Sequence, residues 1–116
     1  GFMGEATLFD VQPEGPHAVR LGPLVIESRD RLEGAAQVAI RPEAWQIGPS
    51  GTGLAGRVTK AAYLGHGYEY TFETELGPIF VVWPQVEAAL QPGMEAGLTL
   101  ARHGVAIVQA PPPSPS

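Results

Sequence analysis

The stretch from Gly56 to Trp83 constrains the fold of this chain more than any other part of the sequence. Residues 68–75 read Tyr-Glu-Tyr-Thr-Phe-Glu-Thr-Glu, so aromatic residues alternate with glutamate and threonine. This alternation is typical of a strand with one face on a core and the other in water. The turns Gly65-His66-Gly67 and Leu76-Gly77-Pro78 flank the segment. The stretch therefore predicts a three-stranded antiparallel meander.

The composition favours short strands over helices. The 116 residues include 15 Gly and 12 Pro without a repeat period, and only 16% of residues are charged. Such a composition in an apolar chain is typical of strands joined by turns, whereas a helical bundle tolerates it poorly. The length fits one compact domain. We therefore expect a single all-β domain.

Short apolar or alternating runs between turns predict about eight or nine antiparallel strands. Outside the meander, the candidate runs are 8–11, 17–21, 24–27, 36–40, 44–47, 98–100 and 105–108. The one credible helix is the short segment Val86–Leu90, which ends at a Gln-Pro-Gly sequence. The domain is expected to cover residues 1–110, and the Pro/Ser-rich tail 111–116 to be disordered.

Charge and residue usage exclude several classes of function. The net charge is −5, with 7 Lys plus Arg scattered among 12 Asp plus Glu. A nucleic-acid-binding surface needs a cationic track, so nucleic acid is not an expected partner. The absence of cysteine excludes disulfides and thiolate sites. Since no secretion signal or membrane-spanning apolar run is present, we expect a soluble, cytoplasmic domain.

Motifs that would support catalysis or metal binding are weak. Gly48 and Gly53 have the spacing of a phosphate loop, but Leu54 and Ala55 replace the required Lys and Ser or Thr. Three histidines, at positions 17, 66 and 103, follow no ligand spacing. Of these, His66 is best placed to contact a partner or ligand, because it occupies a hairpin tip.

Two further patterns have a structural and a functional interpretation. The carboxylates Glu69, Glu73 and Glu75 share one strand face. This pattern is compatible with a cation or acid/base site, but the solvent-exposed face of an amphipathic strand is the preferred interpretation. The aromatic residues of the meander suggest either a stacking platform or core filling, and in a barrel core filling is the more common use. The residues alone indicate a binding or structural barrel, and a free-standing enzyme is the least favoured interpretation.

The sequence resembles the TOBE region that follows the nucleotide-binding domain in ATPase subunits of ABC importers. The resemblance rests on an Arg-Pro-Glu tripeptide after an apolar strand and a Tyr-Leu-Gly tripeptide about twenty residues later. Its motifs are Phe2–Ala6, Val38–Glu43, Gly56–Val58, Tyr63–Gly65, Tyr68, Tyr70 and Gly93–Leu100. Thr7 departs from the Asn more usual at the junction, and the segment after Leu100 lacks the common Pro-Glu ending. The likeness extends from about Phe2 to Val108 and includes nearly the whole chain.

The resemblance implies an oligonucleotide/oligosaccharide-binding-like (OB-like) β-barrel attached to the C-terminal side of an importer ATPase. Such a domain is regulatory or helps two ATPase subunits associate, and it does not hydrolyse ATP. Its implied partners are the ATPase domain of the same parent chain, a twin subunit and the membrane subunits, at the cytoplasmic face of the cell membrane. ATP and Mg would bind the missing nucleotide-binding domain, and no cofactor is expected here. The Phe-x-Gly-Glu-Ala junction favours iron(III) or polyamine as the solute.

Three residues are candidates for contact with a partner or ligand: Arg41, Glu43 and His66. A fixed corner of the barrel is the preferred role for Arg41 and Glu43, and the strand before Pro42 is expected to offer an edge to a twin subunit. Since the chain lacks an initial Met, we expect an excised domain with Gly1 as a cloning remnant. The alternative function is an oxyanion-binding barrel of the molybdate type.

Overall fold

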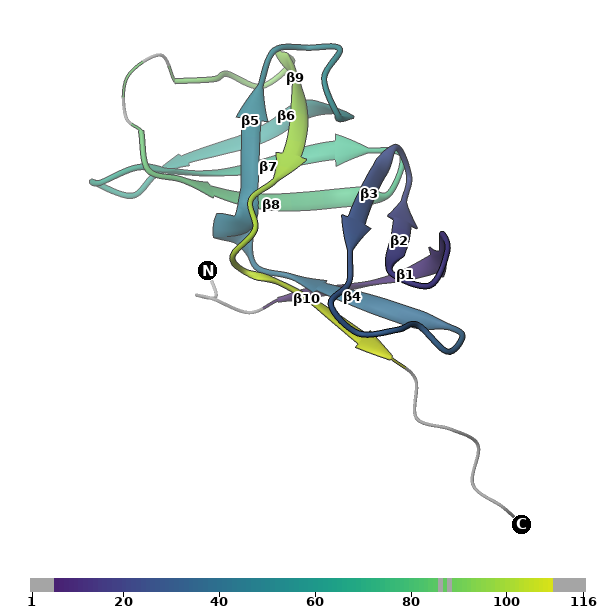
Figure 1. The fold of residues 1–116 in the computed structure, drawn as a ribbon. Coiled ribbons are helices and arrows are strands. Elements are labelled where there is room, and N and C mark those ends of the chain that lie inside the picture. Colours follow the sequence, from purple (N-terminus) through teal and green to yellow (C-terminus); the bar gives the residue numbers. More distant parts are fainter. Residues whose placement is uncertain (1–5, 86, 88, 110–116) are drawn as a thin grey trace.

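The described residues form ten strands and one short 3-10 helix. The computed structural model describes residues 6–85, 87 and 89–109 (Figure 1). The strands form two antiparallel sheets of five strands each. The all-β prediction is therefore confirmed, with slightly more strands than expected. Within the described part of the chain, no helix is long and apolar enough to cross a membrane.

The first sheet contains both ends of the described chain. Its strand order is β10-β4-β1-β2-β3. The bounds are Thr7–Pro13 for β1, Ala18–Leu21 for β2, Leu24–Glu27 for β3, Ala36–Ile40 for β4 and Val105–Gln109 for β10. Strand β1 pairs with β4 over Thr7–Val11, but it pairs with β2 only at Gln12 and Pro13. The β2–β3 hairpin consequently bends away from the other three strands (Figure 1).

The second sheet contains the meander and forms the upper part of Figure 1. Its strand order is β5-β9-β6-β7-β8. The bounds are Trp45–Gly48 for β5, Leu54–Tyr63 for β6, Tyr68–Thr74 for β7, Gly77–Trp83 for β8 and Glu95–Leu100 for β9. The 3-10 helix η1 (Pro42–Ala44) and β5 both contact β8, so the sheet curls until its two edges approach. The predicted antiparallel meander β6-β7-β8 is confirmed.

The aromatic face of β7 lies in the core, as its alternation predicts. Tyr70 and Phe72 are 1% and 0% exposed, and their ring centroids are 6.0 Å apart. Trp45 is also buried and meets Phe9 edge to face at 6.5 Å. Because Phe9 comes from the first sheet and Trp45 from the second, this contact joins the two sheets. Core filling is therefore the main role of these aromatics.

The strand before Pro42 was expected to be an edge strand, and this prediction is wrong. Strand β4 lies between β1 and β10 and pairs with both along its full length. The alternation of buried and exposed residues in β4 is the same for an edge strand as for a central one, so it could not reveal a second neighbour. That neighbour, β10, comes from the far end of the chain. Pro42 does not disturb this pairing, because it follows the strand and begins η1, where a missing N–H is tolerated.

Two expectations concern residues outside the described part. The predicted helix Val86–Leu90 includes residues 86 and 88, and the predicted tail spans 111–116. Neither residue 86, residue 88 nor the tail is described by the structure. The helix, the tail and the domain boundary at residue 110 therefore stay predictions.

Candidate interaction site

Arg41 and Glu43 lie at the corner between the two sheets. The backbone N–H of Arg41 donates to the carbonyl of Gly104 (2.9 Å), and its carbonyl accepts from Ala44 N–H (3.0 Å). The carbonyl of the buried Ala44 in turn accepts from Ala101 N–H (2.8 Å). These bonds join β4, η1 and the turn before β10. The arrangement fits the expected role of a corner, while the Glu43 side chain lies exposed on η1.

His66 occupies the exposed tip of the β6–β7 hairpin, on a different element from Arg41 and Glu43. Leu64 N–H donates to the Gly67 carbonyl (2.8 Å), and this bond closes the hairpin. Gly67 is required here, because a Cβ would collide with the Trp83 carbonyl. The structure thus confirms the turn but leaves the proposed contact role of His66 a prediction.

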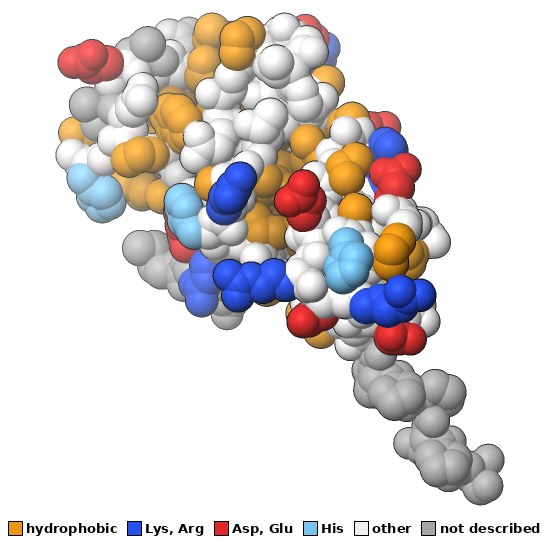
Figure 2. All heavy atoms as spheres, viewed as in Figure 1, with side chains coloured by type: hydrophobic (Ala, Val, Ile, Leu, Met, Phe, Trp, Pro, Cys, Tyr) orange, Lys and Arg blue, Asp and Glu red, His pale blue; other side chains and the backbone are white. Residues whose placement is uncertain are grey.

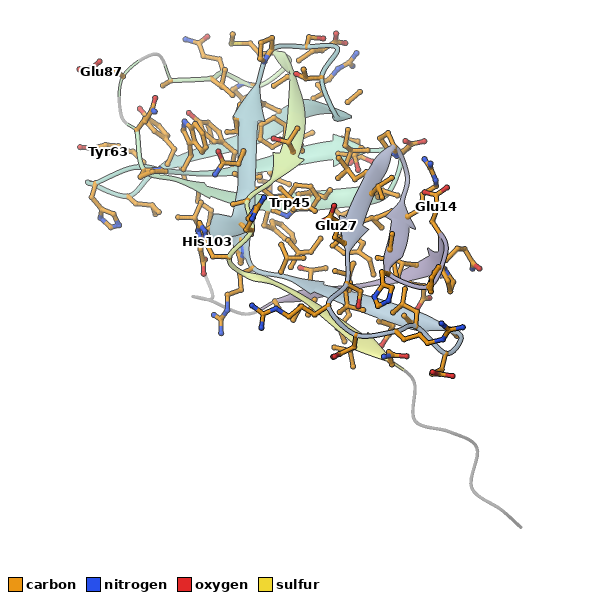
Figure 3. All side chains as sticks on the ribbon, in the orientation of Figure 1. Glu14, Glu27, Trp45, Tyr63, Glu87 and His103 are labelled. Carbon is orange, nitrogen blue, oxygen red and sulfur yellow. The ribbon has the colours of Figure 1, made fainter. Side chains whose placement is uncertain are left out.

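Tyrosine rings support the same hairpin. Tyr63 and Tyr68 have ring centroids 5.4 Å apart, and Tyr68 stacks on Tyr70 at 5.4 Å with an interplanar angle of 10°. The Tyr63 hydroxyl donates to the Gly65 carbonyl (3.0 Å), although the residue is 63% exposed. Figure 3 shows Tyr63 near the far end of the hairpin. The aromatic row therefore stiffens the tip and joins it to the core.

The acidic face of β7 borders a pocket of about 340 Å³ between β6, β7 and β9. Arg57, Glu73, Glu75 and Glu95 line it, and Arg57 pairs with Glu95 at 3.5 Å. Glu75 belongs to the turn after β7, so it does not share the strand face with Glu69 as the sequence suggested. Among the described residues, no group of three acidic, His or Cys side chains is arranged to hold a metal ion.

A larger groove, of about 1090 Å³, was not foreseen from the sequence. One wall is β3 with the segment that follows it, and the other is the segment 99–102 with the start of β10. Its floor is apolar and half-buried, and its walls include Glu27, Arg29, Asp30 and Arg102. Figure 2 shows hydrophobic side chains in this region between acidic and basic ones, and Figure 3 shows Glu27 on the side of β3 that faces the segment after β9.

Residues 38–107 match the model of the TOBE domain family. The chain belongs to the TOBE domain family. Arg41, Glu43 and His66 all lie within the matched segment, whereas β1, β2 and β3 precede it.

This TOBE domain is similar in sequence to part of several Fe(3+) import ATP-binding proteins. It is 36% identical over 114 residues to the Fe(3+) ions import ATP-binding protein FbpC of Brucella abortus (strain 2308), covering 92% of this chain and 32% of that protein. It is 35% identical to FbpC 1 of Rhizobium meliloti (strain 1021), with the same coverage, and 34% identical to FbpC of Agrobacterium fabrum, covering 94% of this chain and 33% of that protein. The chain thus spans about a third of the length of these relatives.

A solved structure shares the fold of the TOBE domain. The cytoplasmic molybdate-binding protein ModG, in its molybdate-bound form, superposes with a TM-score of 0.63. The match covers 90% of this chain and 96% of ModG at 14% sequence identity. This likeness confirms the OB-like barrel expected from the sequence.

Proposed function

We propose that this TOBE domain is the C-terminal accessory domain of an ABC-importer ATP-binding subunit that supports solute uptake. The observation that carries the proposal is the 36% identity to an Fe(3+) import ATP-binding protein over 92% of this chain, which covers only 32% of that protein. Iron(III) is accordingly the favoured solute. In this proposal the remaining two thirds of the parent contain the nucleotide-binding domain, which binds ATP and Mg.

The domain itself has a non-catalytic role in this proposal. It contributes a rigid barrel whose corner at Arg41 and Glu43 and whose hairpin tip at His66 are available to neighbouring subunits. The backbone bonds at Arg41 and the aromatic row below the tip support this role, because both features hold exposed groups on fixed elements. The expected partners are the ATPase domain of the parent, a twin subunit and the membrane subunits, at the cytoplasmic face of the membrane.

ATP hydrolysis by the natural full-length polypeptide tests this division of roles. One variant lacks residues 6–109, and a second has its phosphate-loop lysine replaced by Ala. We expect the lysine variant to lose hydrolysis and the truncated variant to bind ATP and keep hydrolysis, with altered response to the membrane subunits. A natural polypeptide without a nucleotide-binding segment would contradict the proposal, as would a folded truncated variant that cannot bind ATP.

The oxyanion alternative is tested on the same 116-residue chain by thermal unfolding. A ligand at 100 times its Kd stabilises the folded state by about 2.7 kcal/mol. Our proposal predicts no change in melting temperature with millimolar molybdate, tungstate, sulfate or phosphate. A rise in melting temperature with molybdate would favour the alternative, for which the likeness to ModG supports only the fold.

A further inference from the structure

The groove between β3 and the segment 99–105 is bordered by two edge strands of one sheet. Strands β3 and β10 stand at the two ends of the order β10-β4-β1-β2-β3, and residues of both line the groove. An edge strand has backbone N–H and C=O groups that pair with no neighbour on one side, and these groups can accept another strand.

The register shows which backbone groups of β3 point into the groove. Ser28 N–H donates to the His17 carbonyl (2.8 Å), so residues 17 and 28 form a hydrogen-bonded pair of the β2–β3 ladder. Hydrogen-bonded and non-bonded pairs alternate in an antiparallel ladder. Leu24 and Ile26 therefore bond to β2, whereas the N–H and C=O groups of Val25 and Glu27 point away from β2.

The edge of β10 is only partly open. Arg41 N–H donates to the Gly104 carbonyl, so by alternation the backbone groups of Val105 and Ile107 point away from β4. Towards the end of β10, however, the Gln109 side chain accepts from Glu33 N–H (3.0 Å) and donates to the Arg31 carbonyl (3.2 Å). The loop after β3 is thereby held against β10. Strand β3 is the more accessible edge.

Strand β3 is short and carries Glu27, but it lacks the other features that protect an edge. Its sequence is Leu-Val-Ile-Glu, without Pro, Lys or a bulge, and Val25 is 52% exposed. The floor beside it consists of half-buried apolar side chains: Leu24, Ile26, Leu100, Val105 and Ile107. A second extended chain beside β3 would place every other side chain on this floor.

We propose that the groove binds a single extended peptide segment of a partner protein, which pairs with the free edge of β3. Val25 and Glu27 lie two residues apart, so their free backbone groups repeat at about 7 Å, the repeat of another strand. Apolar side chains of the segment pack at alternate positions on the floor, as in other cases of strand addition. This inference concerns the TOBE domain alone and does not depend on the identity of the parent protein.

Charges on the walls define the chemistry of this segment. Glu27, Arg29 and Asp30 lie on the β3 side, which therefore carries one net negative charge, and Arg102 lies on the opposite wall. Among the described residues, no ion pair joins Glu27 or Asp30 to Arg102. A segment with a basic residue towards β3 and an acidic residue towards Arg102 complements both walls. A second copy of this chain fits less well, because the edge strand that it would offer, β3, carries the acidic Glu27 and no basic residue.

The test uses the 116-residue chain and a phage-displayed library of random twelve-residue peptides. Val25→Pro removes an N–H that points into the groove, a position where an edge strand tolerates proline. Val25→Thr is the matched control, since it keeps the N–H and the β-branched shape. Melting curves and circular dichroism establish that both variants are folded, and Glu27→Pro serves as a second blocked variant if Val25→Pro does not fold.

We expect the chain to enrich peptides with apolar residues at alternate positions. Their affinity should fall at least about tenfold, or about 1.4 kcal/mol, with a blocked variant and remain unchanged with Val25→Thr. Amide exchange at Val25 and Glu27 should be fast in the free chain and slow at least about tenfold with bound peptide, while Leu24 and Ile26 stay protected in both states. No enrichment over the blocked variant would overturn the proposal. A dimer of the free chain that the blocked variant converts to monomer would overturn it in favour of a second copy.

Discussion

Replacement of Gly97 by Ala tests how tightly the loop 49–53 is packed against β9. Gly97 is buried in β9 and pairs with Gly48 of β5 and Ala55 of β6. A Cβ at Gly97 would collide with the Thr52 carbonyl, and it would lie 2.5 Å from the Pro49 carbonyl oxygen and 2.7 Å from Thr52 Oγ1. Because two of these atoms are backbone, a rotamer change cannot relieve the overlap.

The expected cost of Gly97→Ala follows from the displacement of the loop. Inserting a methyl group into a packed site costs about 1–3 kcal/mol. Moving the loop also weakens its turn, in which Thr52 N–H and Oγ1 both bond to the Pro49 carbonyl, at about 1 kcal/mol for a typical bond. We therefore expect a loss of about 2–4 kcal/mol in the free energy of unfolding, equivalent to a fall of about 8–16 °C in melting temperature.

Thermal and urea unfolding followed by circular dichroism measure this effect. Gly34→Ala is the matched control, because Gly34 is exposed and a Cβ there has nothing within 4 Å. The control should be unchanged or more stable by up to about 1 kcal/mol. If Gly97→Ala melted within about 2 °C of Gly34→Ala, the packing of the loop on β9 would be refuted.

Three further substitutions test how much a core residue, a corner residue and a surface ion pair each contribute to stability. Phe72→Ala empties a fully buried site between β6 and β8 and should cost about 3–5 kcal/mol in urea unfolding; a cost below about 1 kcal/mol would show that the core is misassigned. Arg41→Ala should lower stability by about 0.5–1 kcal/mol, because a side chain that fixes the corner is removed while the backbone bonds of Arg41 stay. Unchanged melting with altered transporter regulation would instead indicate a ligand or partner contact. Glu95→Gln should change stability by about 0.5 kcal/mol or less at any salt concentration, because Arg57 and Glu95 are 63% and 62% exposed; a larger, salt-dependent loss would indicate a stronger pair.

Local structure could be predicted well from the sequence, because short-range patterns determine it. The runs 24–27 and 36–40 form strands with the predicted bounds, and the meander follows from the alternation in residues 68–74. Turn residues also gave reliable signals, as the positive φ of Gly65 and Gly77 at the two meander turns illustrates (90° and 95°). In these segments the alternation of side chains and the turn residues predict the same strand boundaries.

Strand order could not be predicted, because it depends on contacts between distant parts of the chain. Strand β4 seemed suited to an edge, yet β10, more than sixty residues later, pairs with it. Similarly, β9 inserts between β5 and β6, which are consecutive in sequence. Burial alternation reports which face of a strand is covered, but it does not report how many neighbours the strand has.

The candidate site was predicted in part. The sequence indicated the corner at Arg41 and the hairpin tip at His66, because Pro42 and the two glycines beside His66 are local signals. The groove was missed, since its walls come from residues 24–30 and 99–107. A signal was present: the runs 24–27 and 105–108 contain no Lys or Pro, two residues that often protect edge strands.

Iron(III) uptake tests the central claim, that this TOBE domain serves an importer ATP-binding subunit, most directly. Cells that lack the chromosomal copy of the natural gene would receive the full-length gene, a version without codons 6–109, or an empty vector, and uptake of radiolabelled iron(III) would be measured at equal protein levels. We predict that the full-length gene restores uptake and that the truncated version restores less or loses its regulation. Equal, fully regulated uptake with both versions would contradict an accessory role of the domain, and no uptake with the full-length gene would contradict iron(III) as the solute.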